Sequence, residues 1–142
     1  MERLKLVALD EADLAVISAC LQDAVFKASD VAYGPGQFSL EANRFVWERD
    51  QGARTGERRR AVLAVKRVLA VRSRGIDKTK KDEVHSLLAL RFLPGEEAPR
   101  GMLELVLAGG GAILLDVECI EAQLADMSGS WSTDFKPRHQ AG

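Results

Sequence analysis

The sequence predicts an α+β domain built around a mostly antiparallel sheet. Apolar and polar residues alternate in several short runs, which is the pattern of half-buried strands. Turn signals separate these runs, among them Gly34-Pro35-Gly36 and Gly109-Gly110-Gly111. The two amphipathic stretches that favour helices lie near the two ends of the chain, so helices and strands do not alternate as they do in a parallel α/β fold. We expect a curved sheet or partial barrel of about six strands, with an N-terminal and a C-terminal helix.

The length and composition are typical of one folded domain. The chain has 142 residues, of which 46% are apolar and 29% are charged. We assign residues 1–130 to a single domain and residues 131–142 to a C-terminal tail. No stretch approaches the roughly 18 consecutive apolar residues of a membrane helix, and the first residues lack the pattern of a secretory signal. We expect a cytoplasmic protein without a membrane partner, in which Cys20 and Cys119 are reduced thiols.

A strand and a helix are predicted at the start of the chain. Residues 3–9 alternate as a short strand, and Asp10 suits the N-cap of a helix because its carboxylate can accept hydrogen bonds from the free amides of the first turn. Residues 11–26 are predicted to be helical because apolar residues recur there at steps of three or four, namely Leu14, Ile17, Leu21 and Val25.

A hairpin is predicted next, with its turn at residues 34–36. On its second strand, Phe38 and Leu40 have the opposite parity to Phe45 and Trp47, so we expect a bulge or tight turn near Asn43 that brings both pairs to one face. Residues 49–60 contain no apolar side chain larger than alanine and are predicted to be an exposed loop.

The central part of the chain is predicted to form two strands around a polar loop. Residues 61–74 are mostly Val, Leu and Ala, interrupted by Lys66-Arg67, and predict a long strand with a bulge at that dipeptide. Residues 75–82 are polar and predict a loop. The next strand begins near Val84 and ends at Pro94-Gly95.

A last hairpin and a helix are predicted at the C-terminal end. Residues 102–107 and 113–117 read as strands joined by the three glycines. Residues 117–127 are predicted to be an amphipathic helix because Val117, Ile120, Leu124 and Met127 recur at helical steps. A curved sheet closed by such a helix has a pleckstrin-homology-like layout, which is an analogy of shape alone.

The charge distribution is the feature that says most about function. The segment from Arg54 to Lys81 carries a net charge of +9 in a chain whose total is −1, so the remainder carries −10. If the two polar loops meet in space, their cations form a surface for an anionic partner, either an acidic protein or a nucleic acid. The alternative is a solvated loop pair with cations that protect an edge strand. The candidate binding residues are Arg58, Arg59, Arg60, Arg72, Arg74, Lys78, Lys80 and Lys81.

Other chemistries find little support in the sequence. Nucleic-acid binding is weakened because no aromatic residue lies between Arg49 and Val84. No metal site or cofactor is predicted, because the cysteines and histidines show no CxxC or HxxxH spacing. No serine or cysteine has the sequence context of a catalytic nucleophile, and the glycine run lacks a P-loop lysine. We therefore expect no catalytic residue.

Several runs of the sequence resemble a known family. They include residues 4–25, LKLVALDEADLAVISACLQDAV, together with SRGID at 73–77 and VECIEAQL at 117–124. The chain resembles an uncharacterised family of small bacterial proteins catalogued only as a domain of unknown function. That resemblance implies no activity, cofactor or catalytic residue.

The leading functional hypothesis is a non-catalytic binding or adaptor module with a basic interaction face. One alternative is a small enzyme whose cleft lies between the sheet and the N-terminal helix. Another is a structural protein that forms homo-oligomers, with the basic segment of one copy against the acidic helices of the next.

Overall fold

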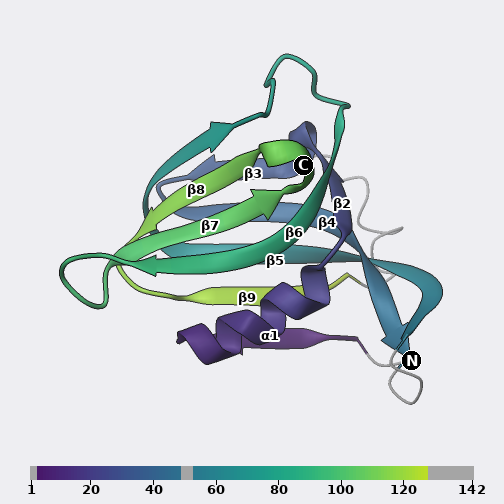
Figure 1. Ribbon diagram of the computed structural model, residues 1–142, viewed down its shortest axis with the longest axis horizontal. Helices are drawn as coiled ribbons and strands as arrows, with labels where there is room; N and C mark the ends of the chain where they lie inside the picture. Colours follow the sequence, from purple (N-terminus) through teal and green to yellow (C-terminus); the bar gives the residue numbers. More distant parts are fainter. Residues whose placement is uncertain (1–2, 49–52, 128–142) are drawn as a thin grey trace.

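The computed structural model describes residues 3–48 and 53–127, which form nine strands and one α-helix (Figure 1). The expectation of a mostly antiparallel sheet is confirmed, with more strands than the six expected. In chain order the elements are β1 (Lys5–Ala8), α1 (Glu11–Leu21), β2 (Ala24–Lys27), the 3₁₀ turn η1 (Ala28–Asp30), β3 (Val31–Gly34), β4 (Gly36–Glu48), β5 (Ala53–Arg74), β6 (Val84–Pro94), β7 (Gly101–Leu107), the 3₁₀ turn η2 (Ala108–Gly110), β8 (Ala112–Val117) and β9 (Ala122–Asp126).

The sheet curls into a partial ring around β5. Leu63 pairs with Leu40 of β4 and also with Leu124 of β9, so these two strands lie on opposite edges of β5. Val68 likewise lies between β4 and β8, which places β8 and β9 end to end along the same edge. From β8 the ladder continues through β7, β6 and β2, and β2 returns to β4 through a single residue pair. The ring is therefore only loosely closed between β2 and β4.

Apolar side chains fill the inside of this ring. On β7, Leu103, Leu105 and Leu107 are all buried on the inner face. They face residues from the other strands that alternate in the same way, among them Phe38, Leu40, Leu63, Leu87, Ile113 and Leu115. Removing these side chains from water is the main force that curls the sheet.

The N-terminal helix is confirmed but is shorter than predicted. The Asp10 side chain accepts a hydrogen bond from the amide of Asp13 at 2.8 Å, as expected of an N-cap, and the predicted stripe on residues 14, 17 and 21 is buried. The helix ends at Leu21 because Asp23 adopts a left-handed conformation, with φ of 68°. Val25, the expected last member of the stripe, lies in β2 opposite Ser86. The helix contacts β1, β4, β6 and β9 and lies at the bottom of the view in Figure 1.

The bulge predicted at Lys66-Arg67 is confirmed. Gln37 pairs with Lys66 and Gly36 with Val68, so Arg67 is the extra residue, and its φ is 61°. The bulge lets Val65 and Val68 both face the core, at 0% and 3% exposure, while two cations remain outside. The bulge predicted near Asn43 is wrong, because the ladder is regular there and the irregularity lies between Phe45 and Trp47.

The exposed loop predicted for residues 49–60 is also wrong over its described part. Residues 53–60 form the start of β5 and pair with the end of β4, while residues 49–52 lie outside the described residues. The sequence of this part of the strand is polar, yet its backbone pairs with β4. By contrast, the loop at 75–82 and the turns at 34–36 and 109–111 lie where the sequence predicted them.

The predicted C-terminal helix at 117–127 is wrong. These residues form the end of β8 and then β9, which lies between β1 and β5. Ile120, Ala122 and Leu124 alternate as buried positions, and a step of four residues fits a strand as well as a helix. The described residues therefore give no support to the pleckstrin-homology-like layout. The tail at 131–142 lies outside them. Within the part of the chain that is described, no helix is long and apolar enough to cross a membrane.

Candidate functional site at the mouth of the ring

A cavity of about 470 Å³ opens at the end of the ring away from α1. We call it the mouth cavity. Its volume lies within the usual range of small-molecule sites, roughly 300–1,000 Å³. Its lining comes from η1, β3, the end of β5, the following loop and β8, and consists of Ala28, Ser29, Val31, Tyr33, Val71, Arg72, Ser73, Ile76, Lys78, Lys81 and Ile113.

The cavity exists because β5 extends beyond the first residue of the neighbouring strand β4. Gly36, the first residue of β4, pairs with Val68, whereas β5 continues to Arg74 with only β8 beside it. Beyond that point η1 and β3 form the opposite wall. The loop at 75–83 connects β5 to β6 across the opening and is the highest feature in the view of Figure 1.

This loop is held in place at three points. Its first residue, Gly75, lies directly against the backbone of Gly111. Ile76 packs against the hydrophobic core, and the carbonyl oxygen of Lys81 accepts a hydrogen bond from the amide of Ser29 at 3.1 Å. These contacts fix the backbone from which Lys78 and Lys81 extend, so the two cations are partly preorganised at the rim.

The chemistry of the lining changes with depth. Ile113, at 2% exposure, lies at the bottom, and the partly buried Val31, Val71 and Ile76 surround it. Hydroxyl groups and the two lysines lie nearer to solvent. None of the described lining residues is acidic. The carboxylate of the nearby Asp77 accepts hydrogen bonds from the hydroxyl and the amide of Thr79. These hydrogen bonds hold the pKa of Asp77 below its usual value.

The remaining predicted residues of the basic loop and strand do not all reach this cavity. Lys80 belongs to the loop but is not among the lining residues. Arg72 borders the cavity, yet its guanidinium donates a hydrogen bond to the sulfur of Met102 at 3.8 Å, on the outer face of the sheet. Arg74 extends to the same face, where it lies 3.8 Å from the buried carboxylate of Glu104, which also pairs with Arg91 at 2.8 Å.

The other predicted trio, Arg58 to Arg60, lies on the first half of β5 and does not join the mouth. The guanidinium of Arg58 lies over the ring of Phe45, 4.7 Å from its centroid. Arg60 pairs with Asp30 at 2.8 Å and with Glu41 at 3.3 Å. Arg59 has the opposite parity and extends inward. The eight predicted residues therefore lie in at least three separate environments, and only Lys78, Lys81 and part of Arg72 border one cavity.

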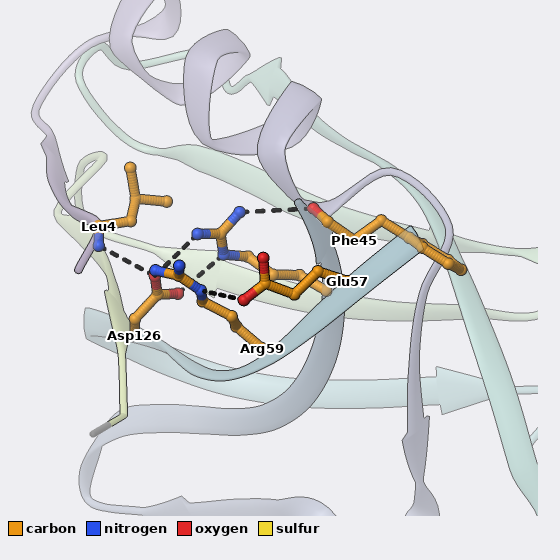
Figure 2. Close-up of polar contacts among 6 residues, drawn as sticks. Leu4, Phe45, Glu57, Arg59 and Asp126 are labelled. Carbon is orange, nitrogen blue, oxygen red and sulfur yellow. Dashed lines mark hydrogen bonds and ion pairs between the residues drawn. The ribbon is translucent and has the colours of Figure 1, made fainter. Parts of the chain in front are cut away.

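A buried ion cluster near α1 was not predicted from the sequence. Asp126, whose side chain is fully buried, accepts hydrogen bonds from Arg44 at 2.8 and 2.7 Å and from the amide of Leu4 at 2.9 Å. Figure 2 shows Arg59 beside Asp126, at 3.7 Å, with Glu57 on its other side at 3.5 Å. The cluster ties β1, β4, β5 and β9 together.

Charge and burial act in opposite directions on this cluster. Burial alone would raise the pKa of Asp126, but hydrogen bonds from Arg44 and Leu4 and the charges of Arg44 and Arg59 hold that pKa below its usual value. The same hydrogen bond raises the pKa of Arg44. A signal for the cluster was present in the sequence, because Arg44 and Asp126 occupy inward positions of otherwise apolar alternations, as polar partners buried together often do.

The stability of the protein is expected to fall in acid through Asp126. Its pKa is lower in the folded than in the unfolded chain, so the unfolded chain takes up the proton first, and stability present near neutral pH is lost as pH falls from about 5 towards 2. Urea unfolding measured between about pH 6 and pH 3 checks this. Asp126→Asn should flatten the dependence. Asp77→Asn should flatten it less, because the pKa of Asp77 is also lowered but this carboxyl is fully exposed to solvent. An unchanged slope in Asp126→Asn would contradict the assignment.

The described residues hold no group of three or more His, Cys, Asp or Glu side chains able to bind a metal ion. Cys20 and Cys119 are free, and burial raises the pKa of the Cys20 thiol despite the opposing charge of Arg44. The expectation of no metal and no catalytic residue stays a prediction.

The fold and the site define a class of protein, namely a small antiparallel partial ring with one α-helix and a basic-rimmed cavity at its mouth. The chain belongs to the family described as "Protein of unknown function (DUF2948)", whose model matches residues 4–139. The family resemblance inferred from the sequence is thereby confirmed. No curated protein and no solved structure matches the chain.

Proposed function

We propose that this protein is a non-catalytic binding module that holds an anionic ligand at the mouth cavity. The observation that carries the proposal is that Lys78 and Lys81 lie on the rim of the same cavity, and that the described lining of this cavity contains no carboxylate. An anion there gains two charge-assisted contacts, and among the described residues neither lysine has an ion pair that the anion would displace. The hydroxyl groups of Ser29 and Ser73 add hydrogen-bond donors at the same opening.

The proposed binding site includes fewer basic residues than the basic interaction face expected from the sequence. Arg60 and Arg74 already contact carboxylates of the chain itself, and Arg59 lies inside the ion cluster. A long nucleic acid or acidic protein would need cations spread along one continuous face. The contacts of these arginines favour a ligand that fits the cavity. We also propose a cytoplasmic location, which the free thiols of Cys20 and Cys119 support.

Titration with inorganic phosphate, followed by amide chemical shifts in NMR spectra, tests this proposal. We expect shifts concentrated at Ser29 and in the loop at 75–82, with an apparent Kd that rises several-fold as salt is raised from about 20 to 200 mM. The double variant Lys78→Ala/Lys81→Ala should lose these shifts. Lys80→Ala is the matched control, because it removes a lysine from the same loop without touching the lining.

Two outcomes would overturn the proposal. One is phosphate binding that the double variant leaves unchanged. The other is a set of shifts spread equally over Arg58, Arg60 and Arg74, because these residues lie away from the mouth.

A further inference from the structure

We infer that the ligand of the mouth cavity is a small amphipathic anion, with an apolar chain inside and an acidic head group at the rim. This inference rests on the proposed function and adds the class of ligand. It follows from the depth profile of the lining, in which the most buried side chain is Ile113 and the two lysines are exposed.

The apolar part of the cavity is the open side of the hydrophobic core. Val31, Val71 and Ile76 are only partly buried, although all three pack against core residues. An apolar chain in contact with them would complete their burial, and each methylene group removed from water would strengthen the binding. A bare inorganic anion leaves this surface in contact with water, so it uses only part of the site.

The head group is placed by the geometry of the rim. Lys81 is fixed through its carbonyl contact with Ser29, and Lys78 lies three residues earlier on the same anchored loop. Tyr33, which is 52% exposed, lies on β3 with the same parity as Val31, so its ring borders the opening. Apolar, aromatic and cationic contacts are thus ordered from the floor to the rim, which fits a molecule with one apolar and one charged end.

Nucleic acid fits this arrangement less well. Single-stranded nucleic acids are held by several stacking rings along a positively charged groove. Among the described lining residues, Tyr33 is the one aromatic side chain. The guanidinium groups of Arg72 and Arg74 lie at Met102 and Glu104, on the outer face of the sheet.

The test compares octanoate with two probes, acetate and 1-octanol, each of which lacks one part of octanoate. We expect octanoate to bind at least tenfold more tightly than acetate, because acetate lacks the chain, and more tightly than 1-octanol, because the alcohol lacks the charge. Calorimetry gives the affinities, and NMR shifts at Ser29 and Ile76 confirm the place of binding. Lys78→Ala/Lys81→Ala should weaken octanoate at least fivefold, and Lys80→Ala should leave it unchanged.

A second variant separates the chain from the head group. Ser73 is an exposed lining residue on β5, so Ser73→Leu fills the cavity without removing either lysine or a core side chain. We expect this variant to lose the advantage of octanoate over acetate. It should weaken phosphate binding far less than Lys78→Ala/Lys81→Ala does, because it removes one hydroxyl group and keeps both lysines.

The outcomes distinguish the two proposals. If octanoate binds no better than acetate, while phosphate still depends on Lys78 and Lys81, the amphipathic ligand is wrong and the anion-binding function stands. If 1-octanol binds as well as octanoate and the lysine variants change nothing, both are wrong. Failure of every probe to bind at the mouth also overturns both.

Discussion

Replacing Asp126 with alanine is expected to cause the largest loss of stability of any single change outside the apolar core. The substitution removes both carboxylate oxygens that accept hydrogen bonds from the Arg44 guanidinium, which is buried at 8% exposure and keeps the carbonyl oxygen of Phe45 at 3.4 Å as an acceptor. It also removes the acceptor of the Leu4 amide. Breaking one side of a buried ion pair costs about 3–5 kcal/mol. Arg59 adds to this cost, because without the carboxylate two like charges face each other. The measurement is the free energy of unfolding in urea near neutral pH.

Two further variants show whether burial causes this loss. Glu121→Ala removes an exposed partner of Arg67, with side-chain exposures of 36% and 59%, and should cost at most about 1 kcal/mol. The double variant Arg44→Met/Asp126→Leu replaces both charges with apolar groups and should be more stable than Asp126→Ala alone. If Asp126→Ala costs no more than Glu121→Ala, the cluster does not hold the four strands together.

Alternation and turn chemistry predicted most of the ring correctly, because both are local. The hairpins at 34–36 and 109–111 carry residues suited to tight turns, and Leu103, Leu105 and Leu107 lie on one buried face of β7. The bulge at Lys66-Arg67 was also predictable, since two consecutive cations inside an apolar strand cannot both face solvent without an extra residue. These features depend on a few neighbouring residues.

The errors arose where distant contacts override the local pattern. The first part of β5 looks like a loop because its side chains are polar, yet β4 supplies a complete hydrogen-bonding partner for its backbone. Residues 117–127 have apolar steps that fit either a helix or a strand, and the strand forms because β9 fills the place between β1 and β5. Whether such a segment forms a helix or a strand depends on the strands that lie beside it in the sheet.

The same limit applies to the candidate site. The segment with a net charge of +9 includes Lys78 and Lys81, which the structure places in the lining of the mouth cavity. It could not show that Arg60 would contact Asp30 and Glu41, because those acids come from η1 and β4, which lie far away in the sequence. The sequence could not predict the apolar floor of the cavity either, because its residues come from β3, β5 and β8, which are distant in the sequence.

Gly75→Ala is expected to affect both stability and the candidate site. Gly75 has a φ of +78°, and a methyl group there would lie 2.8 Å from the Cα atom of Gly111, which belongs to the backbone and cannot move aside cheaply. The left-handed conformation costs a residue with a side chain about 1–2 kcal/mol, and overpacking adds about 1–3 kcal/mol, so we expect a loss of roughly 2–5 kcal/mol in urea unfolding. Because the same contact anchors the loop at 75–83, the affinity for octanoate should fall as well.

Variants at two other glycines separate the effect of the close contact with Gly111 from the effect of the left-handed backbone conformation. Gly109 has a φ of +84° with nothing within 4 Å of an added methyl group, so Gly109→Ala should cost only about 1–2 kcal/mol. Gly34 has neither a left-handed φ nor a near neighbour, and Gly34→Ala should change stability by about 0.5 kcal/mol at most. We expect both to bind octanoate as the unaltered protein does. If Gly75→Ala behaves like Gly109→Ala in both measurements, the contact with Gly111 does not position the loop, and the placement of Lys78 and Lys81 must have another cause.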